Sequence, residues 1–148
     1  MHDLQELLLG LSPDELQYFY QPIYEVARGR ITKAEILLRI ADGSGGYFDM
    51  ETLIAAAEKL NCIYDLDKNA FRHACQVQRE FREHGIVELG VNLSPAACQN
   101  TCLIPEFIRL LKETGGDPEA ICVEITEIYR LLDEQGFYNV VQNLCELG

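Results

Sequence analysis

Two spacings of apolar residues alternate along this chain, one typical of strands and one typical of helices. Residues 18–26 and 31–40 are rich in aromatic and β-branched side chains, and a short turn containing Gly29 separates them. Strands joined by so short a turn pair antiparallel, so we expect a hairpin. Residues 41–46, which include three glycines, predict a loop after it.

Helical spacing appears first at residues 4–11, which predict a short helix. Ser12, Pro13 and Glu15 then form a helix-start signal, with Ser12 as the N-cap. A longer helical section follows the hairpin. It consists of one helix over residues 49–60, a link at 61–67 and a second helix that ends at Gly85.

Strands and helices alternate in the rest of the chain. The pattern predicts a strand at 86–94, a helix at 105–114 that stops at Gly115, a strand at 120–129, and a final helix opened by Asp133 and closed by Gly148. These strands are hydrophobic over nearly their whole length. Strands of this kind form a parallel sheet covered by helices, so the predicted fold class is α/β.

Composition and charge narrow the functions open to the chain. Its 148 residues correspond to about one domain, and its formal net charge of −12 argues against a DNA or RNA partner. A small anionic ligand is still compatible with this charge, because a local arginine or a carboxylate-bound metal can hold a phosphate.

No apolar run approaches the roughly 20 residues that span a membrane, and the N-terminus lacks the features of a signal peptide. We therefore expect a cytoplasmic protein. The six cysteines have irregular spacing and no CxxC pair, which favours free thiols over disulfides. Cys98 and Cys102 with a histidine do not make a convincing zinc site.

Three strands carry a polar residue where a buried strand would be apolar: Glu35, Asn92 and Glu124. Ligands of α/β folds bind where strands end, so we expect these side chains to converge at one end of the sheet. Carboxylates and a carboxamide suit Mg²⁺, Mn²⁺ or Ca²⁺, and they also suit hydrogen bonds to a polar substrate.

Each of these residues has a purely structural alternative. Glu35 would pair with Arg39, Asn92 would cap the turn before Pro95, and Glu124 would face solvent. Spacing alone does not decide between the structural and the functional interpretation.

Four short stretches of the chain resemble the motifs of one family. Tyr-Gln-Pro-Ile stands at residues 20–23, and Glu-Ile-Leu-Leu-Arg stands at 35–39 after a turn with glycine. VNLSP at 91–95 and VEITE at 123–127 follow in the family's order. The chain thus resembles the EAL domain, the family of bacterial phosphodiesterases that hydrolyse cyclic di-GMP. Ile36 stands where the signature has alanine, and its extra bulk could crowd a strand inside a barrel.

The resemblance implies a TIM-type (β/α) barrel of the EAL kind, represented by about its first four strands, with a short helix in front. Residues 1–17 would be a helical lead-in, and residues 18–148 an EAL-like domain that is incomplete at its C-terminal side. In the family the first strand runs antiparallel to the others, in agreement with the short turn at Gly29.

The resemblance also implies roles for individual residues in a two-metal hydrolysis that produces the linear dinucleotide. Mg²⁺ or Mn²⁺ would be the cofactor, and cyclic di-GMP the bound partner. The implied metal ligands are Glu35, Asn92 and Glu124, and the implied substrate-binding residues are Gln21, Leu37 and Arg39. No residue of the chain is assigned as a catalytic acid or base.

Several family residues have no counterpart within these 148 residues: an aspartate pair in Asp-Asp-Phe-Gly, a lysine, a later glutamate and a final glutamine. The chain is then either a fragment of a longer protein or a naturally truncated one. We expect the chain alone to be inactive as a phosphodiesterase. The alternatives are a non-catalytic cyclic di-GMP receptor and a degenerate protein-interaction module. A half-barrel would also self-associate through its open side, or else its C-terminal helix would rearrange to cover the gap.

Overall fold

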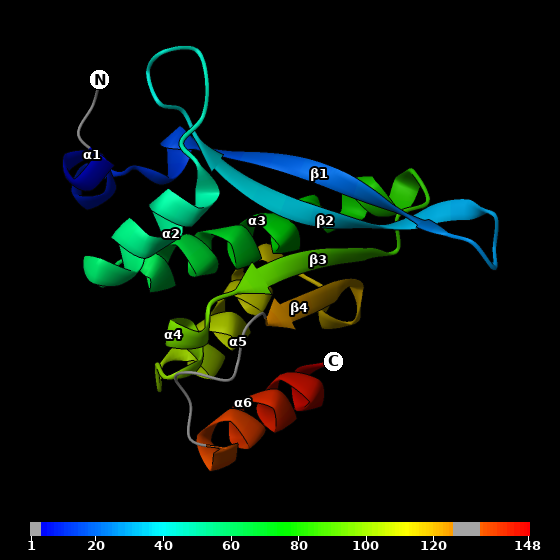
Figure 1. Cartoon of the computed structure of the whole chain (residues 1–148). Helices are drawn as coiled ribbons and strands as arrows, with labels where there is room; N and C mark the ends of the chain where they lie inside the picture. Colours follow the sequence, from blue (N-terminus) through cyan, green and yellow to red (C-terminus); the bar gives the residue numbers. More distant parts are fainter. Residues whose placement is uncertain (1–3, 126–133) are drawn as a thin grey trace.

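The computed structural model describes residues 4–125 and 134–148, which form a four-stranded sheet with helices packed against it (Figure 1). The strands lie in the order in which they occur in the sequence, and they are β1 (Leu16–Glu25), β2 (Arg30–Ile40), β3 (Glu88–Leu93) and β4 (Ile121–Ile125). β1 and β2 pair antiparallel, whereas β2–β3 and β3–β4 pair parallel. The predicted hairpin and the predicted parallel sheet are both confirmed.

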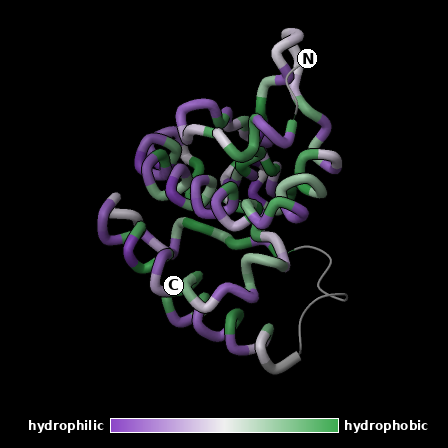
Figure 2. The backbone as a smooth tube through the Cα atoms, turned by 90° about the vertical axis from the view of Figure 1, so that its left-hand side faces the viewer, coloured by the Kyte–Doolittle hydropathy of each residue, from purple (hydrophilic) through white to green (hydrophobic). Residues whose placement is uncertain are grey.

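The helices follow the predicted alternation, with one addition. They are α1 (Leu4–Gly10), α2 (Met50–Lys59), α3 (Ile63–Glu83), α4 (Pro95–Cys98), α5 (Leu103–Thr114) and α6 (Glu134–Leu147). Hydrophilic and hydrophobic residues alternate along the helices, as expected of helices with one buried side (Figure 2). None of the helices in the described part of the chain combines the length and hydropathy needed to cross a lipid bilayer.

Side chains of β2 alternate between the two faces of the sheet. Thr32, Ala34, Ile36 and Ile40 are buried toward the helices. The residues between them point to the other side, which we call the open face; on β2 it comprises Lys33, Glu35, Leu37 and Arg39. The cross-strand register extends this face to Gln17, Phe19 and Gln21 of β1, Glu88, Gly90 and Asn92 of β3, and Cys122 and Glu124 of β4.

Ile36 faces the helices and not the interior of a barrel. It is 3% exposed and belongs to a core cluster that includes Ala70 and Ala74 of α3. The small side chains on α3 leave room for isoleucine at the position where the family signature has alanine. The bulk of Ile36 therefore does not crowd the open face.

α3 begins earlier than the sequence pattern predicted. Residues 63–67 are its first turns and not a link, because Ile63 and Leu66 continue the buried side of the helix. These two side chains pack in one cluster with Leu53 and Ala57 of α2. Contact with α2 thus extends α3 toward its N-terminus.

The predicted caps agree closely with the structure. Ser12 and Glu15 form the expected capping box, although it opens only a three-residue 3₁₀ helix (Pro13–Glu15) that leads directly into β1. Gly85 and Gly115 follow α3 and α5 with φ angles of 85° and 67°. This left-handed conformation favours glycine and ends each helix as predicted.

Two predicted elements extend past the described residues. The last strand was expected over 120–129, of which the structure describes β4 up to Ile125. Asp133, the predicted N-cap of the final helix, also lies outside the described residues. α4 was not predicted; it is a single turn that follows β3 directly.

Candidate functional site

Glu35, Asn92 and Glu124 lie on the open face, on three neighbouring strands. Glu35 is in register with Gly90 of β3, and Asn92 is in register with Glu124 of β4. Nδ2 of Asn92 donates a hydrogen bond to Oε1 of Glu35 over 2.6 Å. The fold thus joins side chains that are 57 positions apart in the sequence.

The absence of a side chain at Gly90 makes room for Glu124. A Cβ atom at this position would overlap Oε1 of Glu124 and would lie 3.6 Å from Cα of Glu35. The carboxylate of Glu124 therefore lies over the backbone of β3 and toward β2. A glycine inside a strand often marks such a close approach.

Electrostatic repulsion between carboxylates characterises this part of the open face. Burial raises the pKa of Glu124, and the negative charges of Glu35 and Glu88 raise it further. Glu88 pairs with Lys33 over 2.6 Å, and this hydrogen bond raises the pKa of the Lys33 ammonium. A divalent cation between Glu35 and Glu124 would relieve the repulsion that remains.

The donor set fits a hard divalent metal ion. Two carboxylates and one carboxamide supply oxygen ligands of the type that Mg²⁺ and Mn²⁺ prefer. Within residues 4–125 and 134–148 there is no group of three or more His, Cys, Asp and Glu side chains placed to bind a metal. The third donor proposed here is the amide oxygen of Asn92, a residue type outside that group.

Arg39 has no acidic partner among the ion pairs of the described residues. Its Nη1 donates a hydrogen bond to the carbonyl oxygen of Leu38 over 2.7 Å. The structural alternative that paired Glu35 with Arg39 is not observed, since Glu35 accepts from Asn92. The Arg39 guanidinium is therefore available to an anionic ligand.

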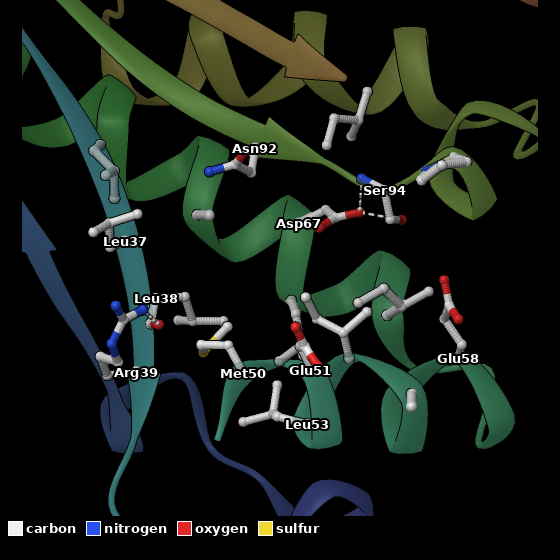
Figure 3. Close-up of a pocket in the computed structure, with 18 residues that line it drawn as sticks. Leu37, Leu38, Arg39, Met50, Glu51, Leu53, Glu58, Asp67, Asn92 and Ser94 are labelled. Atoms are coloured by element: carbon white, nitrogen blue, oxygen red, sulfur yellow. Dashed lines mark hydrogen bonds between the residues drawn. The ribbon is translucent and has the colours of Figure 1, made fainter. Parts of the chain in front are cut away.

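A cavity of about 1080 Å³ lies beside these residues, between β2, α2, α3 and the start of α4. Figure 3 shows Leu37 and Arg39 on one side of this cavity, Asn92 and Ser94 on another, and Glu51 and Glu58 on α2. The cavity is lined by both polar and apolar side chains, and the apolar ones include Met50 and Leu53. Leu37 and Arg39 line this cavity, whereas Gln21, which lies opposite Glu35 on β1, does not.

Asp67 lies at the edge of the same cavity and holds the chain that follows Asn92. Its Oδ2 accepts hydrogen bonds from the backbone N and Oγ of Ser94, over 3.0 and 2.6 Å. Ser94 Oγ in turn accepts from the backbone N of Ala97 and caps α4. Ser94, and not Asn92, is therefore the cap before Pro95. Burial raises the pKa of Asp67 to about 6, although the hydrogen bonds from Ser94 act in the opposite direction.

A family model for the EAL domain matches residues 2–148, nearly the whole chain. The chain belongs to the EAL domain family.

In curated relatives, the region similar to this chain is a minor part of their length. The signalling protein YkoW of Bacillus subtilis is 28% identical over 147 residues, which cover 97% of this chain and 18% of that protein. Cyclic di-GMP phosphodiesterase NbdA of Pseudomonas aeruginosa is 27% identical, with coverage of 97% and 19%. The chain thus spans about a fifth of the length of these relatives.

Solved EAL structures share the fold. The PaMucR phosphodiesterase in complex with c-di-GMP superposes with a TM-score of 0.78 at 22% identity, covering 90% of this chain and 56% of that one. The Xanthomonas citri FimX EAL domain in complex with c-diGMP gives a TM-score of 0.72 at 17% identity, with coverage of 97% and 55%. The four strands described here correspond to about half of such an EAL chain, in agreement with the expected partial barrel.

Two residues of this EAL site were missed by sequence reasoning. Gly90 was not singled out, although a glycine in a predicted strand was a usable signal. Asp67 fell in the segment interpreted as a link, so its position next to the Ser94 cap was hidden. The roles of Glu35, Asn92, Glu124, Gln21, Leu37 and Arg39 remain predictions.

Proposed function

We propose that this chain supplies the first part of a cyclic di-GMP phosphodiesterase site. The observation that carries the proposal is the arrangement of the open face, where Asn92 joins Glu35 beside Glu124. On the same face Arg39 has no acidic partner among the residues that the structure describes. The relatives named cyclic di-GMP phosphodiesterases, and the EAL structures solved with c-di-GMP, support the choice of ligand.

Glu35, Asn92 and Glu124 would hold Mg²⁺ or Mn²⁺ in this proposal. The ion would supply Lewis-acid activation of the phosphodiester and of the attacking water. The hydrogen bond from Asn92 orients the Glu35 carboxylate, and Gly90 lets Glu124 approach it. These contacts fix the ligands before a metal ion arrives, which reduces the cost of ordering them.

Arg39 would bind a phosphate of the dinucleotide. A guanidinium donates two parallel hydrogen bonds to a phosphate, a geometry that lysine cannot reproduce. Leu37 would supply an apolar contact from the same strand, and Gln21 would add a polar group from β1. All three belong to the open face that also carries the proposed metal ligands.

Hydrolysis would need groups beyond those on these four strands, namely the aspartate pair and the lysine that the family resemblance implies. The 148 residues alone should therefore leave cyclic di-GMP intact. In the bacterial cytoplasm, where we expect the protein, a receptor without turnover is the alternative function.

The proposal is tested in the protein that carries this chain, with Mn²⁺ and cyclic di-GMP. Calorimetry measures binding, and chromatography measures the linear dinucleotide. Glu35→Gln and Glu124→Gln should lower metal affinity and abolish turnover, and Arg39→Ala should weaken nucleotide binding. Glu83→Gln, an exposed position on α3, is the matched control and should change none of these three properties.

Three outcomes are informative. Binding with turnover that depends on Glu35 supports a phosphodiesterase. Binding that depends on Arg39, with no turnover under any metal, supports the receptor. A protein that does not bind cyclic di-GMP, or binds equally well after Arg39→Ala, overturns the proposal.

We also propose that the chain, when isolated, self-associates through the open face. The outer strands of the described sheet are β1 and β4, and apolar side chains on the β1–β2 hairpin, such as Phe19, Ile23 and Ile31, are more than 40% exposed. A two-fold dimer would cover them most simply. Light scattering at tens of micromolar should give at least the dimer mass; a stable monomer would contradict this.

A further inference from the structure

The open face carries an aromatic pair that the proposed metal site does not use. Phe19 of β1 and Tyr47, which follows the glycine loop after β2, meet edge to face with ring centroids 5.2 Å apart and planes at 82°. Both side chains carry large aromatic rings, yet they remain 43% and 42% exposed. An edge-to-face pair of this kind is a stable arrangement that still presents ring surface to a ligand.

Tyr47 is held in position by polar contacts and not by burial. Its hydroxyl donates a hydrogen bond to Oε1 of Gln17 over 3.0 Å. Its backbone forms a bridge with Ala41. Asp42 stabilises the loop between them, because its Oδ1 accepts from the backbone N atoms of Ser44 and Gly46. The Tyr47 ring is therefore preorganised at the surface.

The aromatic pair lies next to the residues proposed to bind the nucleotide. Phe19 lies directly opposite Leu37 in the β1–β2 register, and Gln17 lies directly opposite Arg39. The aromatic pair thus flanks the residues proposed to contact a phosphate and an adjacent apolar group. Within the described part of the chain Arg39 forms no ion pair, so a cation and an exposed aromatic surface lie side by side.

A ligand that satisfies both features needs a phosphate and a planar ring. Bases stack on aromatic side chains whatever their hydrogen-bonding edges, and the larger ring of a purine offers more surface than a pyrimidine. We propose that Phe19 and Tyr47 form a stacking wall for one base of the cyclic dinucleotide, and that Tyr47 favours purine over pyrimidine. This inference rests on the proposed function, since it assumes a nucleotide at Arg39.

The experiment compares the affinities of the protein that carries this chain for cyclic di-GMP and cyclic di-UMP. Tyr47→Ala should weaken cyclic di-GMP binding by about tenfold to a hundredfold, because base–aromatic stacking is worth roughly that much. The loss of affinity for cyclic di-UMP should be smaller. The preference for cyclic di-GMP over cyclic di-UMP, expressed as the ratio of the two affinities, should therefore fall. Tyr47→Phe retains the ring and should keep most of this ratio.

A second tyrosine controls for the loss of an exposed ring. Tyr138 of α6 is 63% exposed and lies outside the proposed site, so Tyr138→Ala should leave both affinities unchanged. Thermal melting of all variants checks that they fold. The inference is wrong if Tyr47→Ala leaves the ratio of the two affinities unchanged. It is also wrong if Tyr47→Ala lowers the melting temperature without changing binding, because another part of the protein would then cover the stacking wall.

Failure of this inference can be told apart from failure of the proposed function. If the wild-type protein binds cyclic di-GMP and Arg39→Ala weakens it while Tyr47→Ala does not, the stacking wall is wrong and the phosphate site stands. If the wild-type protein binds neither dinucleotide, both proposals fall together.

Discussion

The carboxylate of Asp67 accepts two hydrogen bonds from Ser94, one from the backbone N and one from Oγ. This contact joins α3 to the residue that opens α4, two positions after Asn92. The end of β3 is thereby tied to α3. Asp67 and Ser94 are therefore expected to influence both stability and the geometry of the proposed metal site.

The Asp67→Asn variant should show a flatter dependence of stability on pH. Burial raises the pKa of Asp67 from its usual 3.8 to about 6, so the folded protein binds this proton more tightly than the unfolded chain. The charged carboxylate then lowers the free energy of unfolding at pH 7, by about 3 kcal/mol, and this penalty fades as the pH falls through 6 toward 3.8. Urea titrations measure this difference. When the pH is lowered from 7 to 5, the free energy of unfolding of the wild-type protein should rise by on the order of 1 kcal/mol relative to that of the variant.

Asp65→Asn is the matched control for this prediction. Asp65 lies on the same helix and its side chain is exposed, so its substitution should leave the pH trend of the wild-type protein unchanged. Parallel stability curves for the wild-type and Asp67→Asn proteins would show that Asp67 titrates alike in the folded and unfolded states.

Ser94→Ala should destabilise the fold at neutral pH and raise the pKa of Asp67. The variant loses the cap of α4, worth about 1 kcal/mol, and it removes one of two hydrogen-bond donors from a partly buried carboxylate. Ser94→Thr keeps the hydroxyl and should recover most of the loss. An NMR titration of the Asp67 carboxyl group measures the shift, and an unchanged pKa in Ser94→Ala would contradict the role given to the hydroxyl.

Gly90→Ala should weaken metal binding without unfolding the protein. A methyl group there would overlap the Glu124 carboxylate and push it away from Glu35. Changing a residue that positions a metal ligand typically lowers metal affinity by about 10- to 100-fold. Calorimetric titration with Mn²⁺ measures this loss. Gly10→Ala, where an added methyl group meets nothing within 4 Å, should bind Mn²⁺ like the wild-type protein.

Ile36→Ala should destabilise the fold even though it restores the family's signature alanine. Ile36 is buried against Ala70 and Ala74, so its truncation leaves a cavity that these small residues do not fill. The expected loss is about 2–4 kcal/mol. The same truncation at Leu9, which is 71% exposed, should cost less than about 0.5 kcal/mol. Urea denaturation measures the loss of stability in both variants. Equal losses at the two positions would show that Ile36 is not part of a packed core.

The strands could be predicted because their aromatic, β-branched and apolar composition is a local property of the sequence. Glu35, Asn92 and Glu124 stood out as polar residues in otherwise apolar strands, and the register puts all three on the open face. Asp67 could not be found in this way. Its burial and its partner Ser94, 27 positions away, depend on how α3 packs against the end of β3.

Helix boundaries were predicted well where a cap defines them and poorly where packing does. Gly85 and Gly115 end their helices in the left-handed conformation, which a sequence pattern reveals. The start of α3 carries no side-chain cap, since Cys62 forms no such hydrogen bond. Contact with α2 sets that boundary, and no local pattern records it.

The order of the strands in the sheet has a consequence for how the protein is made. In the described sheet, each strand after β1 pairs with the strand synthesised just before it. The partner of each new strand has therefore already left the ribosome, and pairing never waits for a distant segment. Contacts between consecutive elements also form faster than contacts across a long chain. The sheet can thus grow during translation from the β1–β2 hairpin, one strand and one helix at a time.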